Sequence, residues 1–258
     1  MGLITKRGHS PRALAIAAVR ELARRWGLEI RRLRARNGEA VDLSSFLVDC
    51  AFRAHGPAAV IQIGANDGIM HDRLRAALTK HNATALLVEP LPDIYERLVA
   101  NYRGYPNVRC ENVAVSTRAG EAVIYRIAPD APDMPDWIQG TASFDRSVLL
   151  KHRHAPGVPA ARYESLIQEV RVPVVTMGQL LQRHPDLSKY TSLHVDTEGH
   201  DYEVVKSAVE AGLRPPLISY EHKHLSHATQ VECRNLLSSL GYQFIDTDED
   251  TFAVQDTV

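Results

Sequence analysis

From Ala58 onward, short apolar runs alternate with amphipathic stretches, and this alternation limits the fold more than any other feature of the chain. The apolar runs predict strands at residues 59–64, 84–90, 108–116, 192–199 and 216–222. Helical patterns follow four of them, at residues 72–81, 91–102, 201–212 and 229–241. Residues 242–254 form two short runs around an acidic turn, which predicts a hairpin. The alternation implies an α/β fold with a mostly parallel sheet and helices on both faces.

Polar side chains gather where these predicted strands end. They are Asn66 and Asp67, then Glu89, then Asp196 and Glu198, then Glu221 and His222. The carboxyl ends of parallel strands share one edge of the sheet, and ligands of open α/β sheets bind at that edge. The sequence therefore predicts one binding site built from several strand ends.

The loop Gly64-Ala65-Asn66-Asp67-Gly68, after the first strand, is suited to a ligand other than a phosphate. A dinucleotide fingerprint needs three glycines, and Asn66 stands where the middle one would approach a pyrophosphate. Asp67 adds negative charge there, and no Gly-Lys-Ser or Gly-Lys-Thr follows. Backbone N–H groups and nearby acidic or amide oxygens suit the carboxylate and ammonium of S-adenosylmethionine. Glu89 can accept hydrogen bonds from both ribose hydroxyls. The alternatives are a structural turn and a solvated strand end.

Composition and charge are those of an ordinary globular protein. The 258 residues suit one domain with elaborations, and a net charge of −1 gives no indication of a nucleic-acid partner. Cys50, Cys110 and Cys233 include no CxxC pair, which predicts free thiols in a reducing compartment. No apolar run approaches the roughly 18 residues of a transmembrane segment. The basic start and the apolar run ending at Val19 lack a small-residue cleavage pattern, so we expect a cytoplasmic protein.

Residues 1–56 predict a helical extension before the alternating region. Apolar residues recur at helical spacing from Leu14 to Leu33, and arginines crowd the other face. One interpretation is that the arginine-rich face is solvated and that the helix packs on the domain or joins two copies in a homo-oligomer. The other is that the helix is a basic arm that binds an anionic membrane surface or an acidic substrate. A second helix is expected over residues 43–54, with Asp42 or Ser44 as its cap.

Residues 126–170 interrupt the alternation, because they are rich in proline and weakly periodic. A long insertion in a compact domain is usually a lid or a binding loop. Trp137 can stack on a sugar face, and Gln139, Thr141 and Ser143 can hydrogen-bond to hydroxyl groups. Alternatively, Trp137 and Phe144 only fix the loop to the domain.

Several stretches together carry a family resemblance. They are VIQIGANDG, LLVEPLPDIYERL, ENVAVST, and LHVDTEGHDYEVVKSA followed by ISYEH. Through them, about residues 60–252 resemble the FkbM family of S-adenosylmethionine-dependent methyltransferases, in which an Ile-Asp-x-Glu-Gly block typically precedes a helix. The resemblance implies a Rossmann-like class I methyltransferase fold, with a seven-stranded sheet whose last pair is antiparallel. Residues 57–258 would be the methyltransferase domain, with 126–170 as its lid-like insertion.

The resemblance also implies roles for single residues. Gly64, Asn66, Asp67 and Gly68 look like the loop beside the methionine part of the cofactor, and Glu89 looks like the ribose ligand. Asn112, Val113 and Ala114 would lie near the adenine. The implied reaction is O-methylation, often of a hydroxyl on a sugar or a natural product.

Asp196, Glu221, His222 and His200 are the candidates for the chemistry itself. An alcohol is a poor nucleophile at neutral pH, so methyl transfer to it needs a general base or a metal ion. His222 or His200 can act as the base, since the pKa of histidine suits that task. Alternatively, Asp196, Glu221 and His222 bind magnesium or manganese. In the third interpretation Asp196 only orients the cofactor or caps a helix.

Three functions remain open at this stage. The first is an O-methyltransferase acting on a small-molecule or oligosaccharide acceptor, such as a glycan or a glycosylated natural product. The second is an RNA methyltransferase that uses the arginine-rich helix as its phosphate-binding arm, although the domain is not basic and lacks an Asn-Pro-Pro-aromatic motif. The third is a non-catalytic scaffold that binds the cofactor.

Overall fold

The computed structural model describes residues 43–55, 59–70, 72, 74–129, 131, 134–135, 138, 140–154, 158–187 and 189–255. The arginine-rich helix predicted before residue 37 therefore lies outside the described residues. The helix predicted at 43–54 is present as α2, Leu43–His55. No helix among the described residues is both long enough and apolar enough to cross a membrane. Cys50, Cys110 and Cys233 are free thiols, as predicted.

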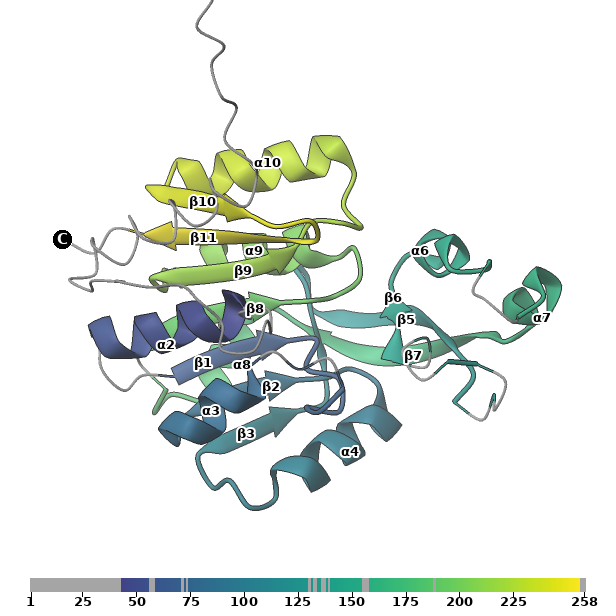
Figure 1. Cartoon of the computed structure of the whole chain (residues 1–258), viewed down its shortest axis with the longest axis horizontal. Helices are drawn as coiled ribbons and strands as arrows, with labels where there is room; N and C mark the ends of the chain where they lie inside the picture. Colours follow the sequence, from purple (N-terminus) through teal and green to yellow (C-terminus); the bar gives the residue numbers. More distant parts are fainter. Residues whose placement is uncertain are drawn as a thin grey trace, which may run out of the picture.

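A seven-stranded sheet forms the centre of the molecule (Figure 1). Its order is β10-β11-β9-β8-β1-β2-β3. The strands are β1 (Ala59–Ile63), β2 (Ala85–Val88), β3 (Val108–Glu111), β8 (Tyr190–Val195), β9 (Leu217–Glu221), β10 (Tyr242–Asp246) and β11 (Asp250–Gln255). All neighbours are parallel except for β11, which runs antiparallel to both β9 and β10. This is the seven-stranded Rossmann-like sheet that the resemblance implies, with the predicted antiparallel hairpin at its edge.

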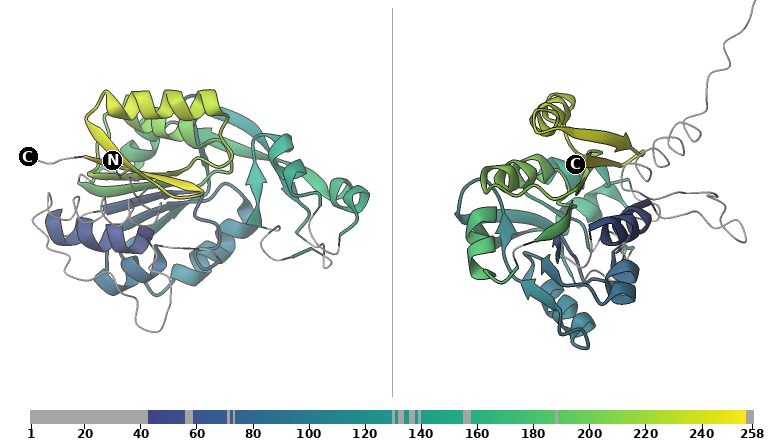
Figure 2. Two further views of the ribbon diagram at one scale, coloured as in Figure 1. Left: turned by 45° about the horizontal axis from the view of Figure 1, so that its top comes forward. Right: turned by 90° about the vertical axis from the view of Figure 1, so that its left-hand side faces the viewer.

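Helices cover both faces of the sheet (Figures 1 and 2). One face packs against α2, α3 (Arg75–His81) and α4 (Pro92–Tyr102). The other packs against α8 (Met177–Arg183), α9 (Asp201–Glu210) and α10 (His227–Ser238). The middle strands are buried because both faces are covered: all five residues of β1 are buried, and four of them are apolar.

A second, four-stranded sheet projects beside the main sheet (right-hand side of Figure 1). Its order is β4-β7-β5-β6, from β4 (Ala114–Val115), β5 (Gly120–Ile127), β6 (Ala142–Ser143) and β7 (Ile167–Val175). Helices α6 (Arg146–Lys151) and α7 (Ala160–Ser165) lie on it, over a small core that includes Ile127, Leu149 and Tyr163. The described part of the segment 126–170 thus contains helices and strands, and the segment begins and ends in two strands, β5 and β7, that the alternation does not predict.

The strand expected at residues 108–116 is two strands in different sheets. β3 ends at Glu111, and β4 begins at Ala114 and pairs with β7. Between them lies Asn112, whose side-chain Nδ2 donates to the backbone carbonyl oxygens of Glu89 (2.8 Å) and Pro90 (3.0 Å). These bonds fix the chain to the end of β2, at the point where it leaves the main sheet.

Candidate functional site

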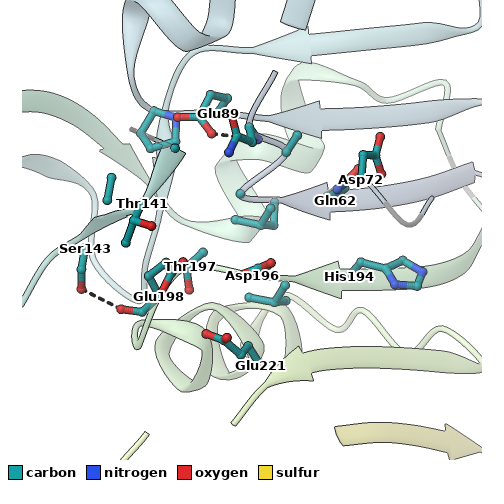
Figure 3. Close-up of a pocket in the computed structure, with 18 of the residues that line it drawn as sticks. Gln62, Asp72, Glu89, Thr141, Ser143, His194, Asp196, Thr197, Glu198 and Glu221 are labelled. Carbon is teal, nitrogen blue, oxygen red and sulfur yellow. Dashed lines mark hydrogen bonds between the residues drawn. The ribbon is translucent and has the colours of Figure 1, made fainter. Parts of the chain in front are cut away.

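A cavity of about 780 Å³ opens at the carboxyl edge of the main sheet. The ends of β1, β2, β8 and β9 form its floor, and β6 of the second sheet closes one side (Figure 3). This is the edge at which open α/β sheets bind ligands. Predicted residues that line it include Gly64, Asn66, Glu89, Val113, Ala114, Thr141, Ser143, Asp196 and Glu221.

Gly64 lets the end of β1 touch the end of β8. Its φ is +83°, and a Cβ built on it would lie 1.8 Å from the carbonyl oxygen of Asp196. The amide of Asp196 donates to the Ile63 carbonyl at 2.9 Å, so the two strand ends are also joined by a hydrogen bond. Only glycine combines this backbone conformation with so close an approach.

Glu89 is buried at the end of β2, and both of its carboxylate oxygens accept backbone hydrogen bonds. Oε2 accepts from the Asn66 amide at 3.0 Å, and Oε1 accepts from the Leu91 amide at 2.9 Å. Burial raises the pKa of Glu89 to about 7, and the two backbone donors oppose that rise. Each oxygen has a second acceptor position, so the carboxylate can still bind a hydroxyl of a ligand.

Asp67 and Gly68 shape the first loop from outside the cavity. Asp67 Oδ1 accepts from the amides of Ile69 (2.9 Å) and Met70 (2.7 Å), which holds the loop in a turn. Gly68 has a φ of +70°, and a Cβ on it would lie 2.5 Å from the Tyr102 ring. Among the described residues neither lines the cavity, and Asn112, at the exit of β3, does not line it either.

Three acidic residues of the β8–α9 turn and of β9 crowd the far end of the cavity. Burial raises the pKa of Glu198 to about 8 and that of Glu221 to about 9, and the carboxylate of Asp196 adds to both shifts. Glu198 has a φ of +52°, which is rare for a residue other than glycine. The Glu221 Oε2 atom is buried and has no hydrogen-bond partner among the described residues.

Asp201, which the strand-end pattern does not single out, organises this turn. It is fully buried, and its Oδ2 accepts from Thr197 Oγ1 (3.0 Å) and from the Gly199 amide (3.3 Å). Its Oδ1 accepts from the Glu221 amide at 3.1 Å, so one carboxyl group joins the β8–α9 turn to the end of β9. Burial raises its pKa to about 7.

The two histidines predicted as bases do not line the cavity in the described part of the chain. His222 Nδ1 lies 3.0 Å from Thr251 Oγ1 of β11. His200 Nε2 lies 3.0 Å from Ser116 Oγ, and its ring packs on Phe144. His222 therefore does not gather with Asp196 and Glu221 as the predicted metal site requires.

The insertion contributes Thr141 and Ser143 to the cavity wall. Ser143 Oγ donates to the Glu198 carbonyl at 2.6 Å, so it holds the β8–α9 turn (Figure 3). The other two predicted acceptor contacts, Trp137 and Gln139, lie outside the described residues.

Gln62 and His194 also line the cavity, although the strand-end pattern does not point to them. They are paired in the β1–β8 register, and Figure 3 shows both on the right-hand side of the view, with Gln62 next to Asp72. Burial lowers the pKa of His194 to about 3, so its imidazole is neutral, and its Nδ1 lies 3.1 Å from Ser219 Oγ. The sequence did carry a signal for these two residues, because each is a polar residue between two apolar residues of a predicted strand.

The cavity lining is strongly acidic. Within the described chain, one lysine, Lys223, faces seven carboxyl groups, those of Asp72, Glu89, Asp196, Glu198, Glu221, Glu249 and Asp250. Lys223 itself pairs with Glu249 at 2.8 Å. At neutral pH the raised pKa values leave part of these groups protonated, so the lining offers both donors and acceptors to a hydroxyl-rich ligand. Its ionised groups attract a cation and repel a polyanion.

Comparisons with known proteins identify the family. The sequence model of the family described as methyltransferase FkbM domain matches residues 62–244. No curated protein matches the chain. Solved structures with a similar course of the chain include a methyltransferase FkbM from Methylobacillus flagellatus KT (12% identity, TM-score 0.45, 93% of this chain and 59% of that one). Another is a precorrin-6y C5,15-methyltransferase from Geobacter metallireducens GS-15 (10% identity, TM-score 0.41, 86% of this chain and 93% of that one). A third is the SAH-bound methyltransferase PaMTH1 from Podospora anserina (11% identity, TM-score 0.42, 99% of each chain).

Proposed function

The chain belongs to the FkbM methyltransferase family, and we propose that it is an S-adenosylmethionine-dependent O-methyltransferase. Its proposed acceptor is a hydroxyl of a sugar, a glycan or a glycosylated natural product. The acidic cavity at the carboxyl edge of the class I sheet is the observation that carries the proposal.

The residues of the cavity fit the proposed cofactor. S-adenosylmethionine supplies an activated methyl group on a positively charged sulfur. Glu89 lies where its carboxylate can accept hydrogen bonds from ribose hydroxyls, with its orientation fixed by the Asn66 and Leu91 amides. The loop after Gly64 presents backbone groups to the methionine part, and Asp196 supplies negative charge next to it. A dinucleotide phosphate would face the same acidic lining and be repelled.

Glu221 is the proposed general base for the acceptor hydroxyl. It lines the cavity, it is buried, and its Oε2 atom has no partner within the described structure. With a pKa of about 9, the Glu221 carboxyl group holds its proton at neutral pH in the free protein. The positive sulfur of the proposed cofactor favours the ionised form, which is then a stronger base than an exposed glutamate. Asp201 holds the backbone of Glu221 in place through the Glu221 amide. His222 and His200, which are not among the described residues that line the cavity, are the less suitable bases.

A hydroxyl-rich acceptor also fits the lining better than RNA. Carboxylates accept hydrogen bonds from sugar hydroxyls, whereas the closely spaced acids repel phosphates. Thr141 can add a hydroxyl contact from the insertion. Salt-sensitive retention of RNA that requires residues 20–36 would favour the RNA alternative instead.

Substitution of Glu89 tests the cofactor site. Glu89→Gln should weaken S-adenosylmethionine binding at least tenfold, measured by calorimetry, because an amide cannot accept from two backbone donors and two hydroxyls at once. The matched control is Glu111→Gln, which ends the neighbouring strand β3 and pairs with Arg183 and His184. Glu111→Gln should leave the affinity unchanged. Equal affinities of wild type and Glu89→Gln would contradict the proposed ribose contact.

A methyl-transfer assay identifies the acceptor class. Labelled S-adenosylmethionine is incubated with panels of oligosaccharides, glycosylated polyketides and structured RNAs. We expect label in a base-stable ether on a hydroxyl-rich acceptor. A scaffold without activity would bind the cofactor and label none of the panel.

A further inference from the structure

A second group of polar side chains lies at the border between the main sheet and the projecting sheet. His152 follows α6 of the insertion, Glu198 lies in the β8–α9 turn, and His224 lies between β9 and α10. One ligand atom from each lies within 4.8 Å of the other two. The three residues come from separate parts of the chain, and sequence spacing does not connect them.

The contact between His224 and Glu198 is unusual for an ion pair. Nε2 of His224 is 3.1 Å from Oε2 of Glu198, yet Oε2 is buried and accepts no well-aligned hydrogen bond from any described residue. The His224 side chain is only 5% exposed. Nε2 of His224 also lies 3.9 Å from Oε1 of Glu221, so one imidazole nitrogen stands between two carboxyl groups, an arrangement that a bound cation would stabilise.

We propose that His152, Glu198 and His224 bind a divalent transition-metal ion at the edge of the cavity. Two imidazoles and one carboxylate are a ligand set of zinc and of other first-row metals, and they suit magnesium poorly. Ligands at about 2.0–2.2 Å from one ion lie closer together than 4.8 Å, so small side-chain rotations complete the site. Three protein ligands leave a coordination position for a further group.

The site connects the insertion to the chemistry, and this step rests on the proposed function. Glu198 is both a ligand and part of the cavity lining. A metal there can bind the acceptor hydroxyl and lower its pKa, which assists removal of the proton by Glu221. The ion also joins α6 of the projecting sheet to the main domain, so binding should rigidify that junction.

Lys151 competes with the metal. Its Nζ lies 3.4 Å from Nδ1 of His224, which favours the tautomer that carries the proton on Nε2. Metal binding at Nε2 moves this proton to Nδ1, and the exposed lysine must then swing away. Replacing Lys151 should therefore tighten metal binding, an effect that misfolding cannot imitate.

Cobalt binding tests the proposal on the full-length protein after treatment with chelator. We expect one equivalent of Co²⁺ to bind, with visible absorption bands typical of nitrogen and oxygen ligands. His152→Ala and His224→Ala should each weaken binding at least tenfold, and Lys151→Ala should strengthen it severalfold. The matched control is His222→Ala, which removes a histidine two positions from His224 whose ring contacts Thr251. It should bind as wild type does, and it corrects for weak binding by the chain's other histidines.

Two results would overturn the proposal. One is the absence of stoichiometric Co²⁺ binding by the wild-type chain. The other is binding that falls equally in His152→Ala and His222→Ala, or that Lys151→Ala leaves unchanged. Calorimetry with S-adenosylmethionine on the chelator-treated protein separates failure of the metal site from failure of the proposed function. The proposed cofactor contacts do not include His152, Glu198 or His224, so the cofactor should still bind if only the metal proposal fails.

Discussion

Gly64→Ala should disrupt the junction of β1 and β8, and the structure indicates by how much. Two effects add at this position. An alanine at a φ of +83° is in a left-handed conformation, which costs roughly 1–2 kcal/mol. Its Cβ would also lie 1.8 Å from the Asp196 carbonyl oxygen, far below the 3.0 Å that real Cβ contacts respect. Overpacking of this kind costs typically about 1–3 kcal/mol.

Two other glycines separate these effects. Gly212 has a φ of +79° and no atom within 4 Å of a built Cβ, so Gly212→Ala measures the conformational cost alone. Gly104 has neither a left-handed φ nor a close neighbour, so Gly104→Ala carries neither cost. In all three variants alanine also lowers the entropy of the unfolded chain, which stabilises the folded state by about 0.4–1 kcal/mol. We therefore expect net losses of about 2–4 kcal/mol for Gly64→Ala and about 1 kcal/mol for Gly212→Ala, and a net gain of about 0.4–1 kcal/mol for Gly104→Ala.

Urea unfolding followed by far-ultraviolet circular dichroism gives these free energies, and calorimetry gives cofactor affinity for the folded variants. Gly64→Ala should also weaken S-adenosylmethionine binding, because relief of the collision moves Asp196. If Gly64→Ala and Gly212→Ala lose the same stability and bind the cofactor equally, the close approach of the two strand ends is not the reason for the glycine.

Two further perturbations act on the same wall of the cavity. In Gly140→Ala the new Cβ would lie 2.5 Å from Asn66 Nδ2, which is the end of a flexible side chain. The free energy of unfolding should therefore change by less than about 1 kcal/mol, while the affinity for the cofactor falls. Affinity restored in the double variant Gly140→Ala/Asn66→Ala would support this reason, and unchanged affinity in Gly140→Ala would refute it. Glu89 has a pKa of about 7 in the folded chain against an ordinary value of 4.5, so the folded state holds its proton more tightly. The contribution of Glu89 to stability is complete below about pH 4.5 and is lost as the pH rises through 7. In urea unfolding from pH 4.5 to 8, the free energy of unfolding should decline less in Glu89→Gln than in the wild type. Parallel pH profiles of the two proteins would contradict the raised pKa of Glu89.

The main sheet was predictable because its strands carry a local signal. Apolar β-formers in β1 and β2 stop at turn residues, and the helices between them repeat at helical spacing. The second sheet was harder to recognise. β7 does alternate, with Val170, Val172 and Val174 on one side, but Pro173 and the weakly periodic stretch before it obscured the pattern.

The site was predictable only as far as strand ends determine it. Glu89, Asp196 and Glu221 line the cavity as expected because parallel strands bring their carboxyl ends together. His222 does not line it because successive side chains of an extended chain point to opposite sides: Glu221 faces the cavity, so His222 faces Thr251 of β11. The approach of His152 to His224 depends on the packing of the insertion, which no local pattern specifies.

The parallel pairing of β4 with β7 places the departure and the return of the projecting sheet side by side, with Ala114 opposite Val174 and Val115 opposite Val175. The segment between these two strands therefore leaves and rejoins the main domain at a single junction. We expect a change of its length to leave the order and pairing of the seven-stranded sheet unaltered, because none of the strands of that sheet lies within the segment.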